Sequence, residues 1–495
     1  MDRLILAIDQ GTTSTRAIVF DLQWRPVAVR QVPLLQHFPH SGWVEHDAEE
    51  IWAATLQVCR GVIAEAGGVD AIAAIGVTNQ RETTVLWDRA TGEPLHRAIV
   101  WQDRRTDDRC DALRDRGMEP VVQNATGLVL DPYFSGSKIA WLLDRVEGAR
   151  DRAARGELCA GTIESWLMFR LGSGRAHVSD ATNASRTSLL DLKTLKWRDD
   201  LLDLFNVPAE VLPEVRPCAG RFTDTDPAHF GRAIAITGSA GDQQAALVGH
   251  AALKAGETKI TYGTGAFLVL NAGDKPVWSK NRLLGTVGYQ IPGATAWALE
   301  GSIFSAGSTV QWLRDVLHAV SRSADSEAMA ASLEDNGGVY LVPGFTGLGA
   351  PWWNAEARGA VTGLNRDTGL KHFVRAGLEA LAYQTFDLLE ALAADAAPKP
   401  SVLKVDGGVT ANGWAMQFLA DICATPVERP AFQEMTALGA ARLAALGAGL
   451  IDSLDVRDAE PPTRWEPKMP EAERKRLLAG WRAAVHGVLA TARPD

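Results

Sequence analysis

The feature that most constrains the fold is a pattern that occurs twice. Residues 4–20 contain an apolar run, the polar turn Gly11-Thr12-Thr13-Ser14 and a second apolar run. Near the middle of the chain, residues 258–270 repeat this order around the turn Tyr262-Gly263-Thr264-Gly265. Each copy is typical of a β-hairpin, in which two strands flank a tight glycine turn. Two copies about half a chain apart predict two related lobes, each opening with such a hairpin.

Strand-like and helix-like segments alternate along the rest of the chain. The apolar runs 71–77, 233–236 and 402–405 each end at a polar or glycine-rich segment, as strands do when they meet a loop. Asp47 precedes residues whose apolar members recur at helical spacing, so it is the predicted N-cap of a helix. The alternation predicts an α/β fold with mostly parallel sheets.

The predicted domain organisation is two lobes that pack around a cleft. The chain has 495 residues, enough for two large lobes with sizeable cores. No low-complexity tract or long linker separates the halves, which favours lobes in mutual contact. We place the boundary near residue 250, giving an N-terminal lobe over 1–250 and a C-terminal lobe over 251–495.

Charge and cysteine usage limit the classes of partner. The formal net charge is −10, which argues against general affinity for nucleic acid or anionic lipid. No apolar run approaches the roughly 20 residues that span a bilayer, so no membrane insertion is expected. Five widely spaced cysteines without a Cys-x-x-Cys pair are typical of reduced thiols. We therefore expect a cytoplasmic protein with no nucleic-acid partner.

The two glycine turns are candidate phosphate-binding sites. Backbone N–H groups in such turns can approach phosphate oxygens closely. Either turn alone is better explained by an ordinary hairpin, but two at matching places favour two phosphate clamps that face each other. Arg16, just past the first turn, is a candidate contact to a transferred phosphoryl group, or else a solvated surface arginine.

Acidic residues at strand ends are candidates for metal binding and proton transfer. Asp9 stands beside the first turn, where a carboxylate can hold Mg²⁺ directly or through waters. Asp242, at the end of a different strand, could accept a proton from an attacking hydroxyl. Both residues could instead cap helices.

The sequence Asp406-Gly407-Gly408 is a third glycine turn, and it suits a nucleotide at a helix N-terminus. The chain has no Gly-Lys dipeptide and hence no P-loop, so any ATP needs another architecture.

A polar pair and several aromatic residues suit a small polyol. Arg81 and Glu82 are an adjacent donor and acceptor after a buried strand, and buried hydroxyls need such partners. Trp101, Tyr133 and Phe267 could form an apolar wall for the carbon backbone, although aromatic residues more often fill cores.

These motifs resemble the glycerol kinases, a branch of the carbohydrate kinase family of sugar and polyol kinases. The resemblance runs in order from residue 4 to about residue 450. It rests on the segments DQGTTSTR (9–16), GWVEHD (42–47), TNQRETT (78–84), WQDRRT (101–106), DPYFSG (131–136), GDQQAAL (241–247), YGTG (262–265), GFTGLGAP (344–351) and DGG (406–408).

The resemblance implies two actin-like or ribonuclease-H-like lobes and the ATP-dependent phosphorylation of glycerol to glycerol 3-phosphate. It implies ATP with Mg²⁺ near Asp9, Asp242 as general base, and a homo-oligomer, either dimer or tetramer. The implied glycerol-binding residues are Arg81, Glu82, Tyr133, Asp242 and Gln243, with Trp101 and Phe267 against the carbons. The implied nucleotide-binding residues are Thr12, Thr13, Ser14, Arg16, Thr264, Gly307, Gln311, Gly408 and Asn412.

Two departures from the family pattern and two rival functions stay open. Gly413 stands where a second amide residue is common, and the stretch 226–233 differs from the glycine-rich loop of members inhibited by fructose 1,6-bisphosphate. A related kinase for another polyol or a ketose would share the lobes but differ around Arg81 and Asp242. A non-catalytic actin-like ATPase would need neither an alcohol site nor a proton acceptor.

Overall fold

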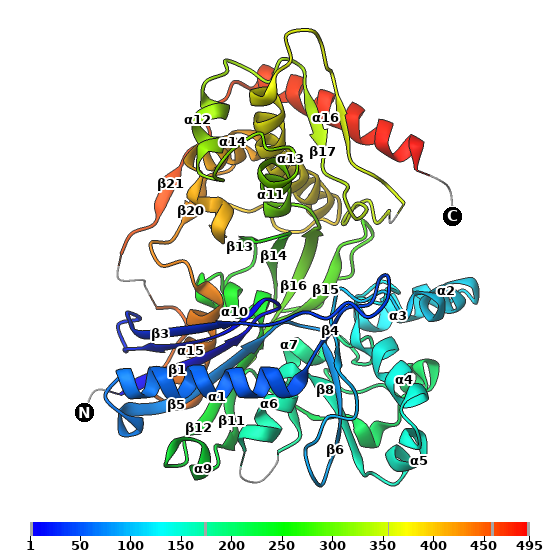
Figure 1. The fold of residues 1–495 in the computed structure, drawn as a ribbon, viewed down its shortest axis with the longest axis vertical. Coiled ribbons are helices and arrows are strands. Elements are labelled where there is room, and N and C mark those ends of the chain that lie inside the picture. Colours follow the sequence, from blue (N-terminus) through cyan, green and yellow to red (C-terminus); the bar gives the residue numbers. More distant parts are fainter. Residues whose placement is uncertain (1–2, 173–175, 355, 457–459, 493–495) are drawn as a thin grey trace.

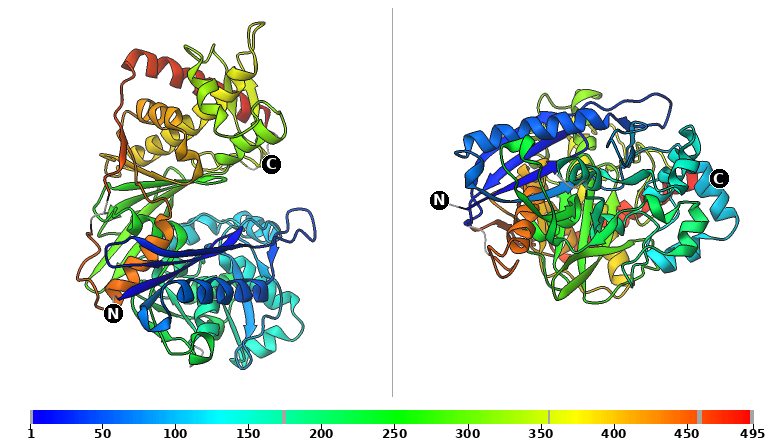
Figure 2. Two further views of the ribbon diagram at one scale, coloured as in Figure 1. Left: turned by 60° about the vertical axis from the view of Figure 1, so that its left-hand side comes forward. Right: turned by 90° about the horizontal axis from the view of Figure 1, so that it is seen from below.

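The structure is a computed structural model that describes residues 3–172, 176–354, 356–456 and 460–492. Figure 1 shows a lower part built around one large sheet and an upper part built around another, and Figure 2 shows both from two further directions. The prediction of two α/β lobes is therefore confirmed.

The first large sheet contains the first predicted hairpin. Its six strands follow the order β11 (Ala219–Asp224), β12 (Ala235–Gly241), β5 (Ile72–Asn79), β1 (Leu4–Gln10), β2 (Ser14–Phe20) and β3 (Pro26–Pro33). β12, β5 and β1 are parallel, whereas β11, β2 and β3 pair antiparallel to their neighbours. The prediction of mostly parallel sheets is thus wrong, because each hairpin adds antiparallel strands to a parallel centre.

Helices cover both faces of this sheet. One face carries α1 (Ala48–Glu65) and α6 (Ile163–Leu171), and α1 begins as predicted, with the Asp47 carboxylate accepting from the backbone N–H of Glu49. The other face carries α10 (Asp242–Gly249) and α15 (Met435–Gly447). Although α15 comes from the last part of the chain, it packs on β1, β5 and β12, and it lies among the blue and green strands in Figure 1.

Glycines allow α15 to approach this closely. A Cβ atom at Gly76 in β5 would overlap the carbonyl oxygen of Ala440 in α15, and one at Gly439 would overlap that of Ala245 in α10. The contact therefore requires a bare backbone at these positions.

The second large sheet contains the second hairpin. Its seven strands follow the order β15 (Leu284–Ile291), β16 (Ala294–Ile303), β14 (Ala266–Gly273), β13 (Thr258–Tyr262), β19 (Leu403–Asp406), β20 (Val427–Arg429) and β21 (Thr463–Trp465). β13 is antiparallel to β14 and parallel to β19, so this sheet is also mixed. Its largest core is formed with α11 (Gly307–Asp315), α13 (Leu370–Ala394), α14 (Gly413–Cys423) and α16 (Glu471–Thr491). A lobe boundary near residue 250 stays a prediction.

A smaller sheet lies beside the first large sheet and supports part of the site. Its order is β4 (Glu45–His46), β7 (Ala98–Ile99), β6 (Thr84–Asp88) and β8 (Leu158–Thr162). Around it are α2 (Asp107–Asp115), α3 (Glu119–Thr126), α4 (Ser135–Arg145) and α5 (Ala149–Ala154). The remaining elements are β9 (Val178–Asp180), α7 (Ala181–Ala184), α8 (Asp199–Phe205), β10 (Glu214–Arg216), α9 (Pro227–Phe230), α12 (Asp325–Ala331), β17 (Tyr340–Val342) and β18 (Ala360–Thr362).

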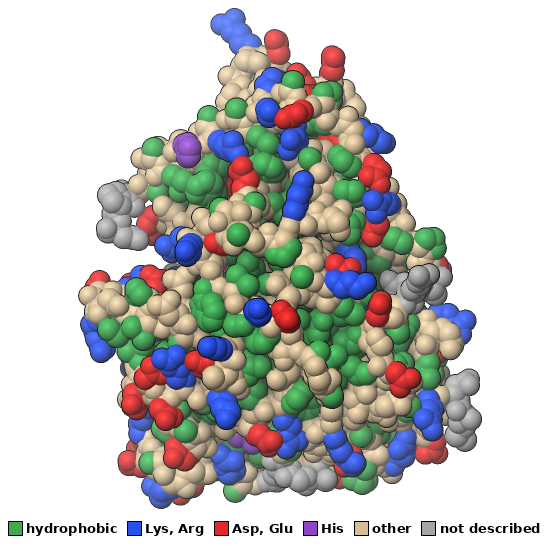
Figure 3. All heavy atoms as spheres, turned by 180° about the vertical axis from the view of Figure 1, so that it is seen from behind, with side chains coloured by type: hydrophobic (Ala, Val, Ile, Leu, Met, Phe, Trp, Pro, Cys, Tyr) green, Lys and Arg blue, Asp and Glu red, His purple; other side chains and the backbone are tan. Residues whose placement is uncertain are grey.

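On the face that Figure 3 shows, the surface is mixed in character. On the face in Figure 3, acidic and basic side chains are interspersed, and apolar side chains gather across the middle. Throughout the described ranges, every helix is too short or too polar to cross a membrane. All five cysteines are unpaired and buried.

Candidate active site

The first glycine turn joins β1 to β2 and borders an open hollow. Thr13 and Ser14, with Gln31 and Pro33 of β3, line a cavity of about 300 Å³. The indole N–H of Trp101 donates to the Thr12 hydroxyl at 2.9 Å. The turn is thus fixed by an aromatic residue that was expected in the polyol wall, while Thr13 remains exposed.

The second glycine turn lies against two segments that the sequence placed at the nucleotide. The backbone N–H of Gly307, at the start of α11, donates to the Gly263 carbonyl at 2.9 Å. Gly407 has φ +93° and lies so close to the backbone of Tyr262 that a side chain would clash. Thr264, Gly307 and Gly408 therefore lie at the end of the second sheet where the parallel strands β13 and β19 stop, and Thr264 is exposed there.

Two other residues expected at the nucleotide lie on helices of the second half. Gln311 is an exposed residue of α11. Asn412 is the N-cap of α14, where its side chain accepts from the backbone N–H of Ala415 at 2.9 Å. The structure therefore already gives Asn412 a capping role.

Asp9 and Arg16 are direct partners across the first hairpin. Burial raises the pKa of Asp9 to about 6; Arg16 opposes this shift and Asp242 adds to it. The Arg16 guanidinium pairs with Glu434, at the start of α15, and donates to Gln31 from Nη2 at 3.0 Å. The two carboxylates, Asp9 and Asp242, are thus near enough to influence each other electrostatically.

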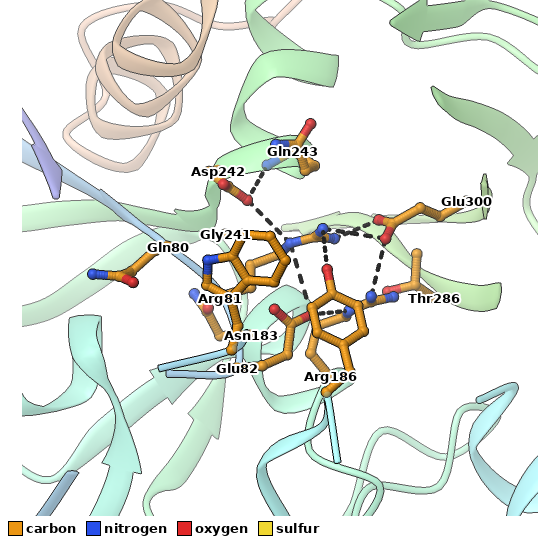
Figure 4. A network of polar contacts seen from close by, with 12 residues as sticks. Gln80, Arg81, Glu82, Asn183, Arg186, Gly241, Asp242, Gln243, Thr286 and Glu300 are labelled. Atoms are coloured by element: carbon orange, nitrogen blue, oxygen red, sulfur yellow. Dashed lines mark hydrogen bonds and ion pairs between the residues drawn. The ribbon is translucent and has the colours of Figure 1, made fainter. Parts of the chain in front are cut away.

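Arg81 stands at the centre of a buried polar network, which Figure 4 shows. Its Nε lies 3.0 Å from Asp242 Oδ1, and its Nη2 donates to the Tyr133 hydroxyl at 3.4 Å. The same guanidinium binds both carboxylate oxygens of Glu300, at 3.2 Å for Nη2. Arg186 donates from Nε to Glu82 at 2.6 Å. The network brings together four residues that the sequence analysis placed at the polyol.

One carboxylate of this network is open to a ligand. The side chain of Asp242 is 31% exposed, whereas those of Glu82 and Glu300 are 1% and 0% exposed. Asp242 is the first residue of α10, and its Oδ1 accepts from the N–H of Gln243 at 2.7 Å. A group bound in the site can therefore reach Asp242 most easily, while Arg81 and Arg186 hold Glu300 and Arg186 holds one oxygen of Glu82.

The three expected aromatic residues lie side by side. The Trp101 ring meets Tyr133 at 5.6 Å and Phe267 at 6.1 Å between centroids, both edge to face. Phe267 belongs to β14 of the second sheet, so this wall joins the two halves of the chain. The aromatic wall lies beside Arg81, whose guanidinium is 6.0 Å from the centre of the Phe267 ring. The site therefore has an apolar side and a polar side.

The sequence analysis missed three buried charged residues of this site. Glu300 and Arg186 belong to the network, and the Lys259 ammonium binds the Gln243 side chain and the Thr261 hydroxyl. Burial lowers the pKa of Lys259 to about 8 despite the neighbouring Asp406 and Asp242. A signal in the sequence was a charged residue next to an apolar run, such as Glu300 after Trp297-Ala298-Leu299. Because charged residues are seldom buried without a partner, such a residue indicates a buried ion pair.

Both halves match known protein domains. The site brings together glycine turns and a buried polar network from two α/β lobes. Residues 4–249 match the N-terminal domain of the FGGY family of carbohydrate kinases, and residues 258–448 match its C-terminal domain. The chain belongs to the FGGY family of carbohydrate kinases.

Individual relatives point to one branch of this family. The chain is 55% identical to a glycerol kinase of Ectopseudomonas mendocina over 99% of both chains, and 55% identical to one of Brucella ovis over 98% of both. A crystal structure of Plasmodium falciparum glycerol kinase with ADP superposes with a TM-score of 0.93 at 36% identity, over 99% of this chain and 98% of that one. A gluconate kinase of Lactobacillus acidophilus shares the fold at 22% identity, with a TM-score of 0.89 over 99% of both chains.

Proposed function

We propose that this protein is an ATP-dependent kinase that transfers the γ-phosphoryl group of ATP to glycerol, giving sn-glycerol 3-phosphate and ADP. The observation that carries the proposal is the contact between Arg81 Nε and the accessible Asp242 carboxylate, 3.0 Å apart beside an aromatic wall. The relatives named glycerol kinase, which match the chain over almost its whole length, support the same substrate.

The residues of the network suit a three-carbon polyol. Arg81 and the Tyr133 hydroxyl offer donors, Glu82 and Asp242 offer acceptors, and Trp101 with Phe267 gives the carbon atoms an apolar surface. Gln243 supplies a further amide at the start of α10. A buried hydroxyl without a partner costs about 1–3 kcal/mol, so this set favours a ligand whose hydroxyls match it.

Asp242 acts as the general base for the terminal hydroxyl. It takes the hydroxyl proton as the oxygen forms a bond to the γ-phosphorus, and the bond from that phosphorus to the β-γ bridging oxygen breaks to release ADP. Arg81 orients the carboxylate through the contact of its Nε with Oδ1. Such transfer depends mainly on positioning and charge stabilisation.

The nucleotide binds between the two glycine turns. Thr12, Thr13, Ser14 and Arg16 contact the phosphates from the first turn and Thr264 contacts them from the second. Arg16 leaves Glu434 to do so. Gly307, Gln311, Gly408 and Asn412 hold the remainder of ATP.

Asp9 fits a magnesium ion held mainly by the nucleotide. In the described part of the chain, no three His, Cys, Asp or Glu side chains gather closely enough to hold a metal by themselves. Mg²⁺ commonly uses one or two carboxylates together with waters and phosphates. The pKa of Asp9 is raised because burial disfavours its charged form, and a neighbouring cation would stabilise that form. When bound, the ion would offset charge on the β- and γ-phosphates.

We also propose that the protein works in the cytoplasm as a homo-oligomer, either dimer or tetramer. Five buried, unpaired thiols suit a reducing compartment. Light scattering on the purified protein measures the mass of the assembly, and a monomer would contradict the proposed homo-oligomer.

The direct test is an ATP-coupled assay over glycerol, longer polyols, ketopentoses and gluconate. We expect glycerol to give the highest kcat/KM, and preference for another substrate would reassign the enzyme within the family. ATP hydrolysis that no polyol or sugar accelerates would favour the non-catalytic ATPase.

The variant Asp242→Asn tests the general base. It should retain nucleotide binding and lose at least about a hundredfold in kcat, which is the usual scale for removing a general base. Asp199→Asn is the matched control, because Asp199 also begins a helix but is exposed and lies outside the network. Undiminished turnover in Asp242→Asn would refute the assigned role.

A further inference from the structure

Two arginines share one carboxylate behind the proposed polyol site. Glu300 Oε1 accepts from Arg186 Nη2 at 3.0 Å and from Arg81 Nη2 at 3.2 Å, while its Oε2 accepts from Arg81 Nη1. The side chains of all three are at most 2% exposed. Figure 4 shows Glu300 on the side of Arg81 away from Asp242. Glu300 is therefore enclosed by protein and does not itself face a ligand.

The carboxylate comes from the other half of the chain. Glu300 lies in β16 of the second sheet, opposite Val269 of β14 and Leu284 of β15. Arg81 follows β5 of the first sheet, and Arg186 follows α7. The ion pairs thus fix a loop of the first half to the middle of a strand in the second half.

Arg186 holds the second member of the polyol pair. Its Nε donates to Glu82 Oε1 at 2.6 Å. Glu82 has φ +59°, the left-handed region that a residue with a long side chain rarely adopts. Its carbonyl accepts from the hydroxyls of Thr84 at 3.0 Å and Ser135 at 3.1 Å. This unfavourable backbone conformation persists because the surrounding contacts determine it, as is common at functional sites.

Stability alone explains this arrangement poorly. Burying an ion pair costs about as much in desolvation as it gains by attraction, and apolar side chains of similar volume often serve equally well. A charged bridge does give directional hydrogen bonds, and the bidentate contact between Arg81 and Glu300 fixes the plane of the guanidinium. That plane determines where Arg81 Nε lies relative to Asp242.

We propose that Glu300 and Arg186 are positioning residues for polyol recognition: Glu300 orients Arg81 toward Asp242 and the substrate, and Arg186 holds Glu82 while sharing Glu300. This inference rests on the proposed kinase function. Recognition of the polyol then depends on the Glu300 carboxylate of the second sheet, although the substrate does not touch that carboxylate. The site is also complete only when the two halves are in register.

The variant Glu300→Gln tests the proposal. It keeps the volume of the side chain but removes the charge and turns an amide N–H₂ toward the arginines. We expect the KM for glycerol to rise about tenfold or more, since hydrogen bonds to charged groups are the stronger ones, while the KM for ATP changes less than about twofold. A purely structural residue would lower the amount of active enzyme without separating these two constants.

Glu379→Gln is the matched control. Glu379 is also a fully buried carboxylate of the second half, paired with Arg375 at 2.8 Å, but its other partners are Asn336 and Tyr383. The control variant should lose stability and keep both KM values. An equal shift of the KM for glycerol in both variants would overturn the proposal.

Arg186→Lys provides a second route if Glu300→Gln does not fold. Lysine retains the positive charge but cannot bind Glu82 and Glu300 together through a planar fork. We expect the KM for glycerol to rise while the KM for ATP changes little, as in Glu300→Gln. In the double variant, the loss of glycerol affinity, expressed as a free energy, should be smaller than the sum of the losses in the two single variants. An unchanged KM for glycerol in Arg186→Lys would refute the role of Arg186.

The wild-type enzyme separates failure of this inference from failure of the proposed function. If it prefers another polyol, the glycerol assignment fails, and the same comparison is made with the preferred polyol. If wild type phosphorylates glycerol and neither variant changes its KM, the positioning role alone fails.

Discussion

Acid should weaken this protein partly through Glu300. Burial by itself would raise the pKa of that carboxyl, but the guanidinium groups of Arg186 and Arg81 outweigh it and lower the pKa from 4.5 to about 2. A carboxyl whose pKa is lower in the folded state stabilises the fold above its unfolded pKa. That contribution disappears as the pH falls from 4.5 toward 2.

The size of the effect follows from the shift. At about 1.4 kcal/mol for each pKa unit, ionisation of Glu300 makes the free energy of unfolding near neutral pH about 3 kcal/mol higher than it would be with this carboxyl protonated. By about pH 3, about 2 kcal/mol of this contribution is lost. The Glu300→Gln variant has no titrating group at this position and lacks that part of the pH dependence.

The assay is urea unfolding of both proteins at several pH values between about 7 and 3. We expect the difference in free energy of unfolding between wild type and Glu300→Gln to shrink by about 2 kcal/mol across this range. Glu379 gives a control of opposite sign: burial raises its pKa despite Arg375, so lowering the pH should improve wild type relative to Glu379→Gln. A pH-independent difference for Glu300→Gln would refute the reasoning.

Two further predictions concern the first glycine turn and the helix contact. Trp101→Phe keeps an aromatic ring but loses the hydrogen bond to Thr12, so the KM for ATP should rise about fivefold, the scale of one neutral hydrogen bond; steady-state kinetics with an unchanged KM would contradict this. Gly439→Ala should lower the free energy of unfolding by about 3 kcal/mol, because its Cβ would overlap the Ala245 carbonyl. Gly487→Ala, in an open part of α16, should instead raise stability by about 0.5–1 kcal/mol, and equal urea midpoints for the two variants would disprove the overlap.

Local patterns predicted the elements well and their pairing less well. The two hairpins and the Asp47-capped helix depend on residues near in sequence, and all three are confirmed. The direction of strand pairing and the position of α15 depend on contacts between segments far apart in the sequence. Alternating strands and helices favoured parallel sheets, yet the hairpin strands themselves made both sheets mixed.

For the site, the residues in loops and at strand ends were easier to predict than the charged residues inside strands. Arg81, Asp242 and Tyr133 lie in polar segments at strand ends or loops, and the structure brings them together. Glu300 and Lys259 lie inside strands, where an alternating pattern assigns a charged side chain to the solvent face and gives no partner for it. Pairing a buried charge requires knowledge of what packs against it, and that knowledge comes only from the three-dimensional structure.

The return of α15 to the first sheet has a consequence for synthesis on the ribosome. The first sheet is otherwise complete once β12 has emerged, yet the part of its face that α10 does not cover stays apolar and exposed until residues 435–447 follow. About two hundred further residues must leave the exit tunnel before that face is sealed, and exposed apolar surface on a nascent chain favours aggregation. Chaperones that bind this face would protect the growing polypeptide during that interval.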